Sequence, residues 1–213
     1  MNLSKRSLFI GAASLALVGG AGALWLSSAE AAIDVGAPAP NFSVVDAAGN
    51  TRTLSEFAGK TLILEWTNKD CPFVVRQYNS GNMQAVQQAA AGHGAVWLQV
   101  ISSAPGEQGH LSGAEALAQA QAVNAQVETV LIDESGDMGH AYGATNTPHM
   151  YIINPEGVLV YQGAIDSRST ANSNTGFDGV TNYVTGALAS LAAGEAVDPA
   201  QTRAYGCTVK YAS

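Results

Sequence analysis

The stretch that most constrains the fold runs from Leu62 to Tyr78, because it places one cysteine between an apolar segment and a helix. Residues 61–66 are mostly apolar and lead into polar residues, as an interior strand does before an exposed loop. Pro72 suits the first turn of a helix, where a missing N–H costs nothing. Cys71 then lies at or beside the N-cap, where unpaired N–H groups and the helix dipole favour thiolate over thiol. We therefore expect Cys71 to be a nucleophile.

The segment around this cysteine resembles the active site of the thioredoxin superfamily. Residues 71–74, Cys-Pro-Phe-Val, are similar to its Cys-x-x-Cys motif, with Val74 in place of the second cysteine. Residues 147–149, Thr-Pro-His, and 205–211, Tyr-Gly-Cys-Thr-Val-Lys-Tyr, extend the likeness to bacterial peroxiredoxin-like redoxins related to AhpC/TSA proteins. The resemblance implies a thioredoxin-like α/β fold with an added N-terminal β-hairpin and a C-terminal tail that carries Cys207.

The same resemblance assigns roles to further residues. It implies that Pro148 is cis and that the Thr147 backbone pairs with a substrate cysteine beside Cys71. The alternative is an ordinary trans proline that opens a strand, since an X-Pro bond can adopt either form. Residues expected to contact the substrate are Trp66, Pro72, Phe73 and His149.

His149 has a second interpretation, as a general base or as a copper ligand together with Cys71. Strand alternation sends His149 and Met150 to opposite faces, so at most one of them faces Cys71. The four histidines are dispersed and show no metal-ligand spacing, and the sequence indicates no cofactor.

Glu65 stands six residues before the cysteine, inside the apolar strand. It resembles the buried proton-handling carboxylate of thioredoxins. The alternative is a carboxylate at the rim of the site, paired with a nearby cation.

The sequence departs from peroxiredoxins at the cysteine itself. Those proteins carry a Pro-x-x-x-Thr-x-x-Cys frame, whereas here Asn68 occupies the threonine position and Leu64 the proline position. Val74 also removes the partner with which thioredoxin resolves a mixed disulfide. Thiol–disulfide exchange is therefore favoured, and a thiol peroxidase with antioxidant activity is the alternative.

Cys207 is the other cysteine of the chain. As a structural staple, a Cys71–Cys207 disulfide closes a long loop and stabilises by roughly 5 kcal/mol. As a resolving thiol, Cys207 attacks the mixed disulfide or sulfenic acid formed on Cys71, which needs a tail that can both dock and move. Residues 205–207 are typical of a turn that can fold back onto the domain.

The first 31 residues have the features of an export signal. Lys5 and Arg6 precede an uncharged stretch, and Ala29-x-Ala31 is a small-residue cleavage site. The opening also shows a faint twin-arginine similarity, so export by the Sec or the Tat route and a periplasmic or otherwise extracytoplasmic location are expected. The alternative is an uncleaved membrane anchor.

The remaining chain suits one redoxin domain over residues 32–194, followed by the tail, 195–213. The formal net charge of the whole chain, −8, and the lack of a basic cluster argue against nucleic-acid binding. The expected partners are protein thiols or disulfides, or a small thiol reductant, with peroxide for the peroxidase alternative. A non-enzymatic copper-binding or copper-delivery module is the candidate from a different class.

Periodicity and turn signals outline the scaffold. We expect strands over 41–45, 51–54, 61–66, 95–102, 129–132, 150–153 and 158–162. We expect helical segments over 55–59, from Pro72 to about 90 with a kink or break near Gly81, and over 114–126, 136–142 and 180–193.

Overall fold

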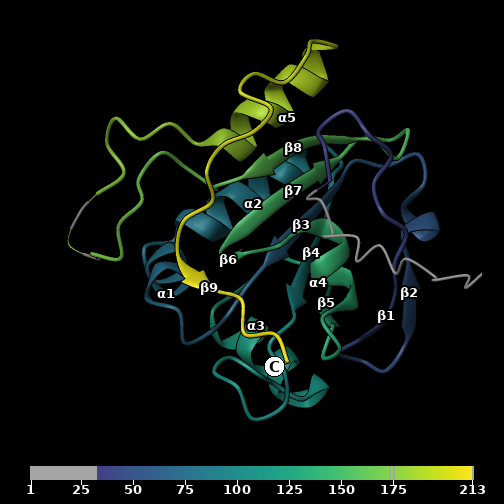
Figure 1. Cartoon of the computed structure of the whole chain (residues 1–213). Coiled ribbons are helices and arrows are strands. Elements are labelled where there is room, and N and C mark those ends of the chain that lie inside the picture. The colour runs from purple at the N-terminus through teal and green to yellow at the C-terminus, as the bar shows by residue number, and fades with distance from the viewer. Residues whose placement is uncertain (1–32, 173, 175, 213) are drawn as a thin grey trace, which may run out of the picture.

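The computed structural model describes residues 33–172, 174 and 176–212, and the expected export signal and the last residue of the tail lie outside the described residues. The polypeptide forms one central β-sheet with helices on both faces (Figure 1). No helix in the described part of the chain is both long and apolar enough to cross a membrane.

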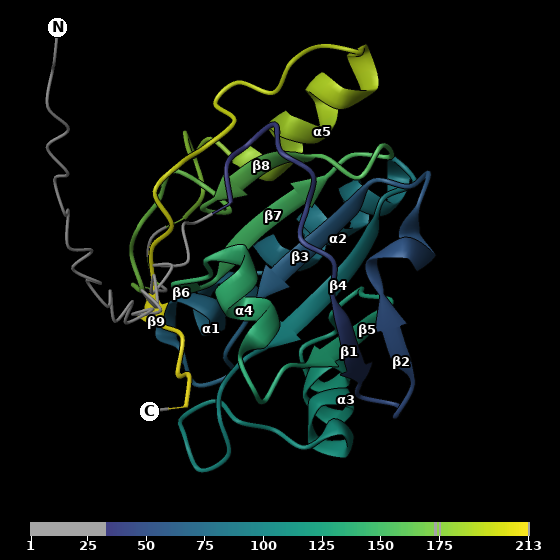
Figure 2. The ribbon, with the colours of Figure 1, turned by 45° about the vertical axis from the view of Figure 1, so that its right-hand side comes forward.

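The central sheet has seven strands in the order β2-β1-β5-β4-β3-β7-β8. Strands β3, β4 and β5 run parallel, whereas β7 is antiparallel to β3 and β8 is antiparallel to β7. The strands are β1 (Ser43–Asp46), β2 (Thr51–Thr53), β3 (Leu62–Trp66), β4 (Val96–Ile101), β5 (Thr129–Ile132), β7 (His149–Ile153) and β8 (Leu159–Gly163). A separate pair is formed by β6 (Asn146–Thr147) and β9 (Cys207–Thr208), beside the end of β7 (Figure 2).

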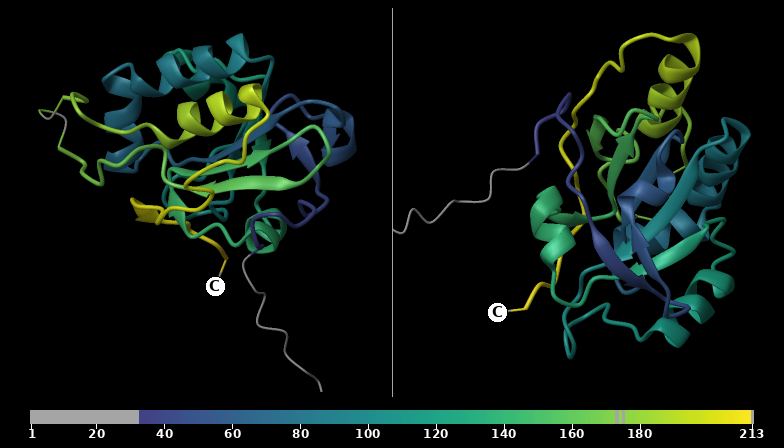
Figure 3. Two further views of the ribbon diagram at one scale, coloured as in Figure 1. Left: turned by 90° about the horizontal axis from the view of Figure 1, so that it is seen from above. Right: turned by 90° about the vertical axis from the view of Figure 1, so that its right-hand side faces the viewer.

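The helices form two unequal layers. They are η1 (Leu54–Phe57), α1 (Pro72–Asn79), α2 (Asn82–Gly92), α3 (Gly113–Ala122), α4 (Asp137–Tyr142) and α5 (Tyr183–Ala193). Helices α1, α2 and α5 cover one face of the sheet and α4 lies on the other (Figure 3). Because strand residues alternate between the faces, Leu64 and Trp66 pack in the α4 layer, whereas Ile63 packs with α1, α2 and α5. Cys71 belongs to the latter layer.

These observations confirm the thioredoxin-like α/β fold and nearly all of the expected elements. The break near Gly81 is real: its φ of +78° separates α1 from α2, which makes two helices of the expected segment. The two-residue strands β6 and β9 were not expected, because they are too short to show a period.

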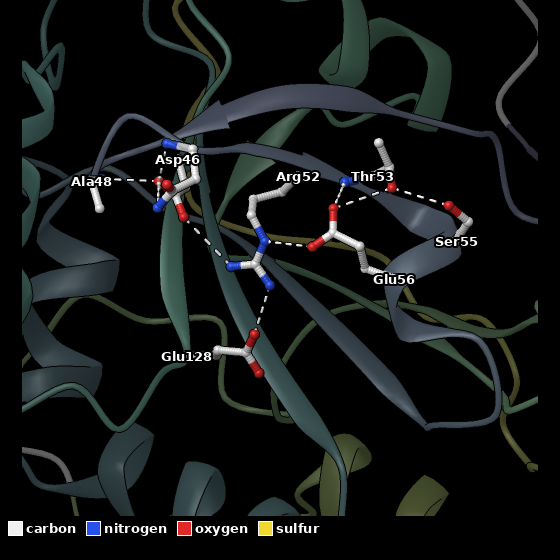
Figure 4. A network of polar contacts seen from close by, with 8 residues as sticks. Asp46, Ala48, Arg52, Thr53, Ser55, Glu56 and Glu128 are labelled. Atoms are coloured by element: carbon white, nitrogen blue, oxygen red, sulfur yellow. Dashed lines mark hydrogen bonds and ion pairs between the residues drawn. The ribbon is translucent and has the colours of Figure 1, made fainter.

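The N-terminal hairpin is fixed by polar contacts (Figure 4). Asp46 accepts hydrogen bonds from the backbone N–H groups of the β1–β2 turn, at 3.0 and 2.9 Å. Arg52 on β2 bonds Glu56 at 2.8 Å and Glu128, just before β5, at 2.7 Å. The guanidinium therefore links the hairpin, which forms one edge of the central sheet, to the start of β5, the strand that pairs with β1.

Candidate active site

Cys71 is the N-cap of α1, as its sequence context predicts, and Pro72 opens the helix. The loop before it is held by Asn68, whose side chain accepts from the Asp70 N–H at 2.9 Å and donates to the Gln108 carbonyl at 3.1 Å. The Asn68 carbonyl also accepts the Cys71 N–H at 3.0 Å. The position of the cysteine is thus fixed from both sides, by the loop and by the helix.

Thr147 and Pro148 lie against this cysteine. The Thr147–Pro148 peptide bond is cis, as expected. The Cys71 thiol donates a hydrogen bond to the Thr147 carbonyl oxygen at 3.1 Å. Both groups are buried, and Cys71 has no exposed surface.

Cys207 reaches the same point from the tail. Its register partner in the β6–β9 pair is Thr147, and both cysteines are free thiols. The two thiols lie close enough to interact. Burial raises the pKa of the Cys207 thiol to about 12, and its interaction with Cys71 adds to that rise. The tail therefore folds back as expected and brings the second sulfur to the first.

The residues that follow Cys71 divide between surface and core. Pro72 is exposed and Phe73 is half-buried, so both remain beside the site where a substrate would approach. Val74, at the second cysteine position of the thioredoxin motif, is buried in the core.

Trp66 and His149 lie on the face of the sheet opposite the layer that contains Cys71. Trp66 is fully buried, and its indole packs against Tyr142 and Tyr151. The His149 ring lies 4.6 Å from the Tyr151 ring, and Trp66 and His149 are register partners, so both face the α4 layer. It is Met150 that shares a core cluster with Cys71. A substrate-contacting role for these two residues stays a prediction: Trp66 is closed off from solvent, whereas His149 borders a cavity that Arg203 of the tail also lines.

The burial of His149 also decides its protonation state. Burial lowers the pKa of its imidazole to about 4, so the ring is neutral at pH 7. A copper site made with Cys71 does not fit residues on opposite faces of the sheet. Among the described residues there is no cluster of three or more His, Cys, Asp or Glu side chains arranged to hold a metal ion.

Glu65 is a buried acid rather than a carboxylate at the rim, so the alternative interpretation of an exposed ion pair is wrong. Its side chain has no exposed surface and lies on the Cys71 face of the sheet. The Tyr78 hydroxyl donates to it at 3.0 Å and the Trp97 indole N–H at 2.9 Å, while Gln87 lies at 3.4 Å. Burial raises the pKa of Glu65 to about 7, against the lowering effect of these hydrogen bonds.

A second polar cluster near the cysteines was not expected from the sequence. Asp166, which is 1% exposed, accepts the Tyr205 hydroxyl at 2.7 Å and the Gln77 amide at 2.8 Å. Tyr205 comes two residues before Cys207, and its ring lies 5.8 Å from that of Phe73. A cavity of about 570 Å³ adjoins the cluster and is bounded in part by Arg203. The only hint in the sequence was the presence of Tyr205 in the tail motif.

Comparison with known proteins places the chain in a family. The chain matches the AhpC/TSA family over residues 35–162, more than half of its length, whereas no curated protein matches it. A hypothetical protein from Sinorhizobium meliloti 1021 is 26% identical and superimposes with a TM-score of 0.72, over 86% of this chain and 97% of that one. An uncharacterized conserved protein from Geobacillus kaustophilus is 23% identical, with a TM-score of 0.71 over 84% and 93% of the two chains.

A putative thiol:disulfide interchange protein DsbE from Chlorobium tepidum shares the fold. It is 24% identical, with a TM-score of 0.50 over 62% of this chain and 85% of that one. The cis proline, the helix-capping cysteine and the sheet order described above agree with a thioredoxin-like fold, and the family match over residues 35–162 identifies the chain as a member of the AhpC/TSA family.

Proposed function

We propose that this protein catalyses thiol–disulfide exchange outside the cytoplasm, with Cys71 as the nucleophile and Cys207 as the resolving thiol. The observation that carries the proposal is that both sulfurs meet at one backbone position. Cys71 donates to the Thr147 carbonyl, and Cys207 is the register partner of Thr147. A purely structural disulfide does not require the N-cap of a helix or a cis proline beside it.

The reaction from the dithiol form balances in two steps. The Cys71 thiolate attacks one sulfur of a substrate disulfide, so that a Cys71–substrate disulfide forms, the substrate S–S bond breaks and one substrate thiolate leaves. The Cys207 thiolate then attacks the Cys71 sulfur, which forms the Cys71–Cys207 disulfide and releases the second substrate thiolate. An external dithiol returns the protein to its reduced form by the same two steps in reverse.

The order of the two cysteines follows from their surroundings. Because the pKa of Cys207 is raised to about 12, this thiol keeps its proton at neutral pH, which leaves the first attack to Cys71. Once Cys71 is bound in a mixed disulfide, its interaction with the Cys207 thiol is lost. That interaction had added to the rise in the Cys207 pKa, so Cys207 becomes easier to ionise at the step where it must act.

The compartment is proposed from the sequence, and the partners are proposed from the surroundings of Cys71. Residues 1–31 are proposed as a cleavable export signal, 32–194 as the redoxin domain and 195–213 as the tail. The partners proposed are protein thiols and disulfides or a small thiol reductant, because an exposed Pro72 and a half-buried Phe73 flank the site.

The test is to trap the mixed disulfide. In the Cys207→Ser variant, a disulfide-bonded protein substrate is expected to accumulate as a covalent adduct on Cys71, detected by non-reducing gel and mass spectrometry. The Cys71→Ser variant is the matched control and should form no adduct. Equal trapping by both variants, or by neither, overturns the assignment of the nucleophile.

Thiol peroxidase activity is the second candidate, because the sequence motifs resemble those of peroxiredoxin-like redoxins and the chain matches the AhpC/TSA family over residues 35–162. At the site, however, Asn68 occupies the position of the peroxiredoxin threonine, and its side chain is used to hold the loop. Peroxide consumption with a thiol reductant should therefore be slow relative to disulfide reduction. A rate of peroxide loss above that of disulfide reduction would reverse this order.

A further inference from the structure

The tail pairs through its backbone with neighbouring segments both before and after Cys207. The Thr202 N–H donates to the Gln162 carbonyl at 3.0 Å, and the Val209 N–H donates to the Thr145 carbonyl at 3.0 Å. Between them β9 pairs with β6 (Figures 1 and 2). This edge includes Thr147, beside which the family resemblance places the substrate cysteine. The tail and a substrate segment therefore compete for the same backbone groups.

The Tyr205 side chain occupies a pocket beside this edge. Its hydroxyl donates to Asp166 at 2.7 Å and accepts from the Gln77 amide at 3.0 Å, while the ring lies beside Phe73. Asp166 and Gln77 are 1% and 0% exposed, so the polar end of the pocket lies inside the protein. A ring without the hydroxyl would take one donor from Asp166 Oδ1, which would keep the Arg168 N–H at 2.9 Å, and would take one acceptor from the Gln77 amide. The pocket therefore favours tyrosine over phenylalanine.

Gly206 sets a second requirement, directly before the cysteine. Its φ is +118°, and a β-carbon at this position would overlap the Thr147 carbonyl oxygen. Only glycine lets the paired backbone approach this closely. After the cysteine, Val209 is buried in the core cluster of the α4 layer. The edge thus fits tyrosine, glycine and cysteine in succession, followed two residues later by an apolar side chain.

We propose that this edge is a docking groove for extended polypeptide segments that carry Tyr-Gly-Cys, and that the tail is its resident occupant, which a substrate must displace. The inference rests on the proposed exchange function and names its substrate class. The groove is defined by Thr147, Phe73, Gln77 and Asp166. The same contacts are open to any polypeptide that binds in the groove. Because the tail is covalently attached, it competes with a substrate at a high effective concentration. The complete burial of Cys71 in the presence of the tail agrees with this arrangement.

The first experiment tests the selectivity of the groove. The full-length Cys207→Ser protein is mixed with synthetic peptides of sequence Arg-Ala-Tyr-Gly-Cys-Thr-Val-Lys, whose cysteine is joined by a disulfide to thionitrobenzoate. Attack by the Cys71 thiolate forms the Cys71–peptide disulfide, breaks the peptide–thionitrobenzoate bond and releases coloured thionitrobenzoate, and mass spectrometry verifies the adduct. The peptide with phenylalanine for tyrosine should react about tenfold more slowly, the effect of one lost hydrogen bond to a charged group. The peptide with alanine for glycine should be slowed at least as much.

The second experiment tests whether the tail is the resident occupant. Adding Tyr205→Phe to the Cys207→Ser protein weakens the hold of the tail but leaves Asp166 and Gln77 in place. All disulfides, including free dithiobis(nitrobenzoate), should then react about tenfold faster, and the preference for the tyrosine peptide should persist. Gly186→Ala in α5, where an added β-carbon meets no atom within 4 Å, is the matched control and should change no rate.

The outcomes separate the two proposals. If dithiobis(nitrobenzoate) reacts with Cys71 but the three peptides react at the same rate, the groove is refuted and the exchange function stands. If Tyr205→Phe leaves all rates unchanged, the tail is not the competing occupant and this inference is also overturned. If Cys71 reacts with no disulfide in a folded protein, as judged by circular dichroism, both the proposed function and the groove fail.

Discussion

Replacement of Glu65 by glutamine tests the buried acid behind the active site. Glutamine has the shape of a protonated carboxyl group and can keep the contacts with Tyr78 and Trp97. It cannot ionise. The variant therefore isolates what ionisation of Glu65 does to stability.

The sign of the effect follows from the two pKa values. The carboxyl has a pKa of 4.5 in the unfolded chain and about 7 in the folded one. Between these values the folded state holds a proton that the unfolded state has lost, so the free energy of unfolding falls as the pH rises. At about 1.4 kcal/mol for each pKa unit, ionisation costs the wild type about 3 kcal/mol by the time the pH passes 7. Glu65→Gln removes this loss.

The assay is urea denaturation of reduced protein at several pH values, followed by tryptophan fluorescence and circular dichroism. The difference in unfolding free energy, variant minus wild type, should rise by about 3 kcal/mol between pH 4 and pH 7.5. Parallel curves for the two proteins across this range would show that Glu65 ionises normally, and the argument from burial would be refuted.

The other predictions use the same denaturation assay. His149→Gln should show the opposite trend, because burial lowers the pKa of the imidazole from 6.5 to about 4. The unfolding free energy of the wild type should fall by about 3 kcal/mol as the pH drops through that window, whereas that of the variant should not. Equal losses in the two proteins would contradict this. Arg52→Ala should lower the unfolding free energy by about 1–2 kcal/mol, less at 1 M salt, because three carboxylates lose their shared cation, and a salt-independent loss would argue against the ion pairs. Gly109→Ala should cost about 1–3 kcal/mol, since its φ is +87° and the Asn68 side chain fills the space of a β-carbon, whereas Gly186→Ala should be neutral or stabilising.

The part of the site that could be predicted from the sequence is the part encoded locally. Cys71, Pro72 and the preceding apolar strand lie within a few residues of one another, and the helix start follows from proline chemistry. The cis form of Pro148 was not a local inference, because it rested on the family resemblance.

The rest depends on contacts between distant segments. The alternation of strand residues shows that His149 and Met150 face opposite ways. Which of the two faces Cys71 depends on which helices pack against each side of the sheet, and the sequence does not give that packing. Likewise Tyr205 and Asp166 are far apart in the sequence and meet only because the tail folds back. Glu65 was ambiguous for the same reason, since its uncharged partners come from α1, α2 and β4.

The reduction potential of the Cys71–Cys207 pair tests the central claim most directly. Full-length protein is equilibrated in dithiol buffers of known potential, and free thiols are counted by mass spectrometry after alkylation. A pair that exchanges with substrates should have a potential of roughly −120 to −270 mV, the range of known exchange proteins. A potential below about −300 mV would instead identify a structural disulfide, and the proposed exchange through these two cysteines would be contradicted.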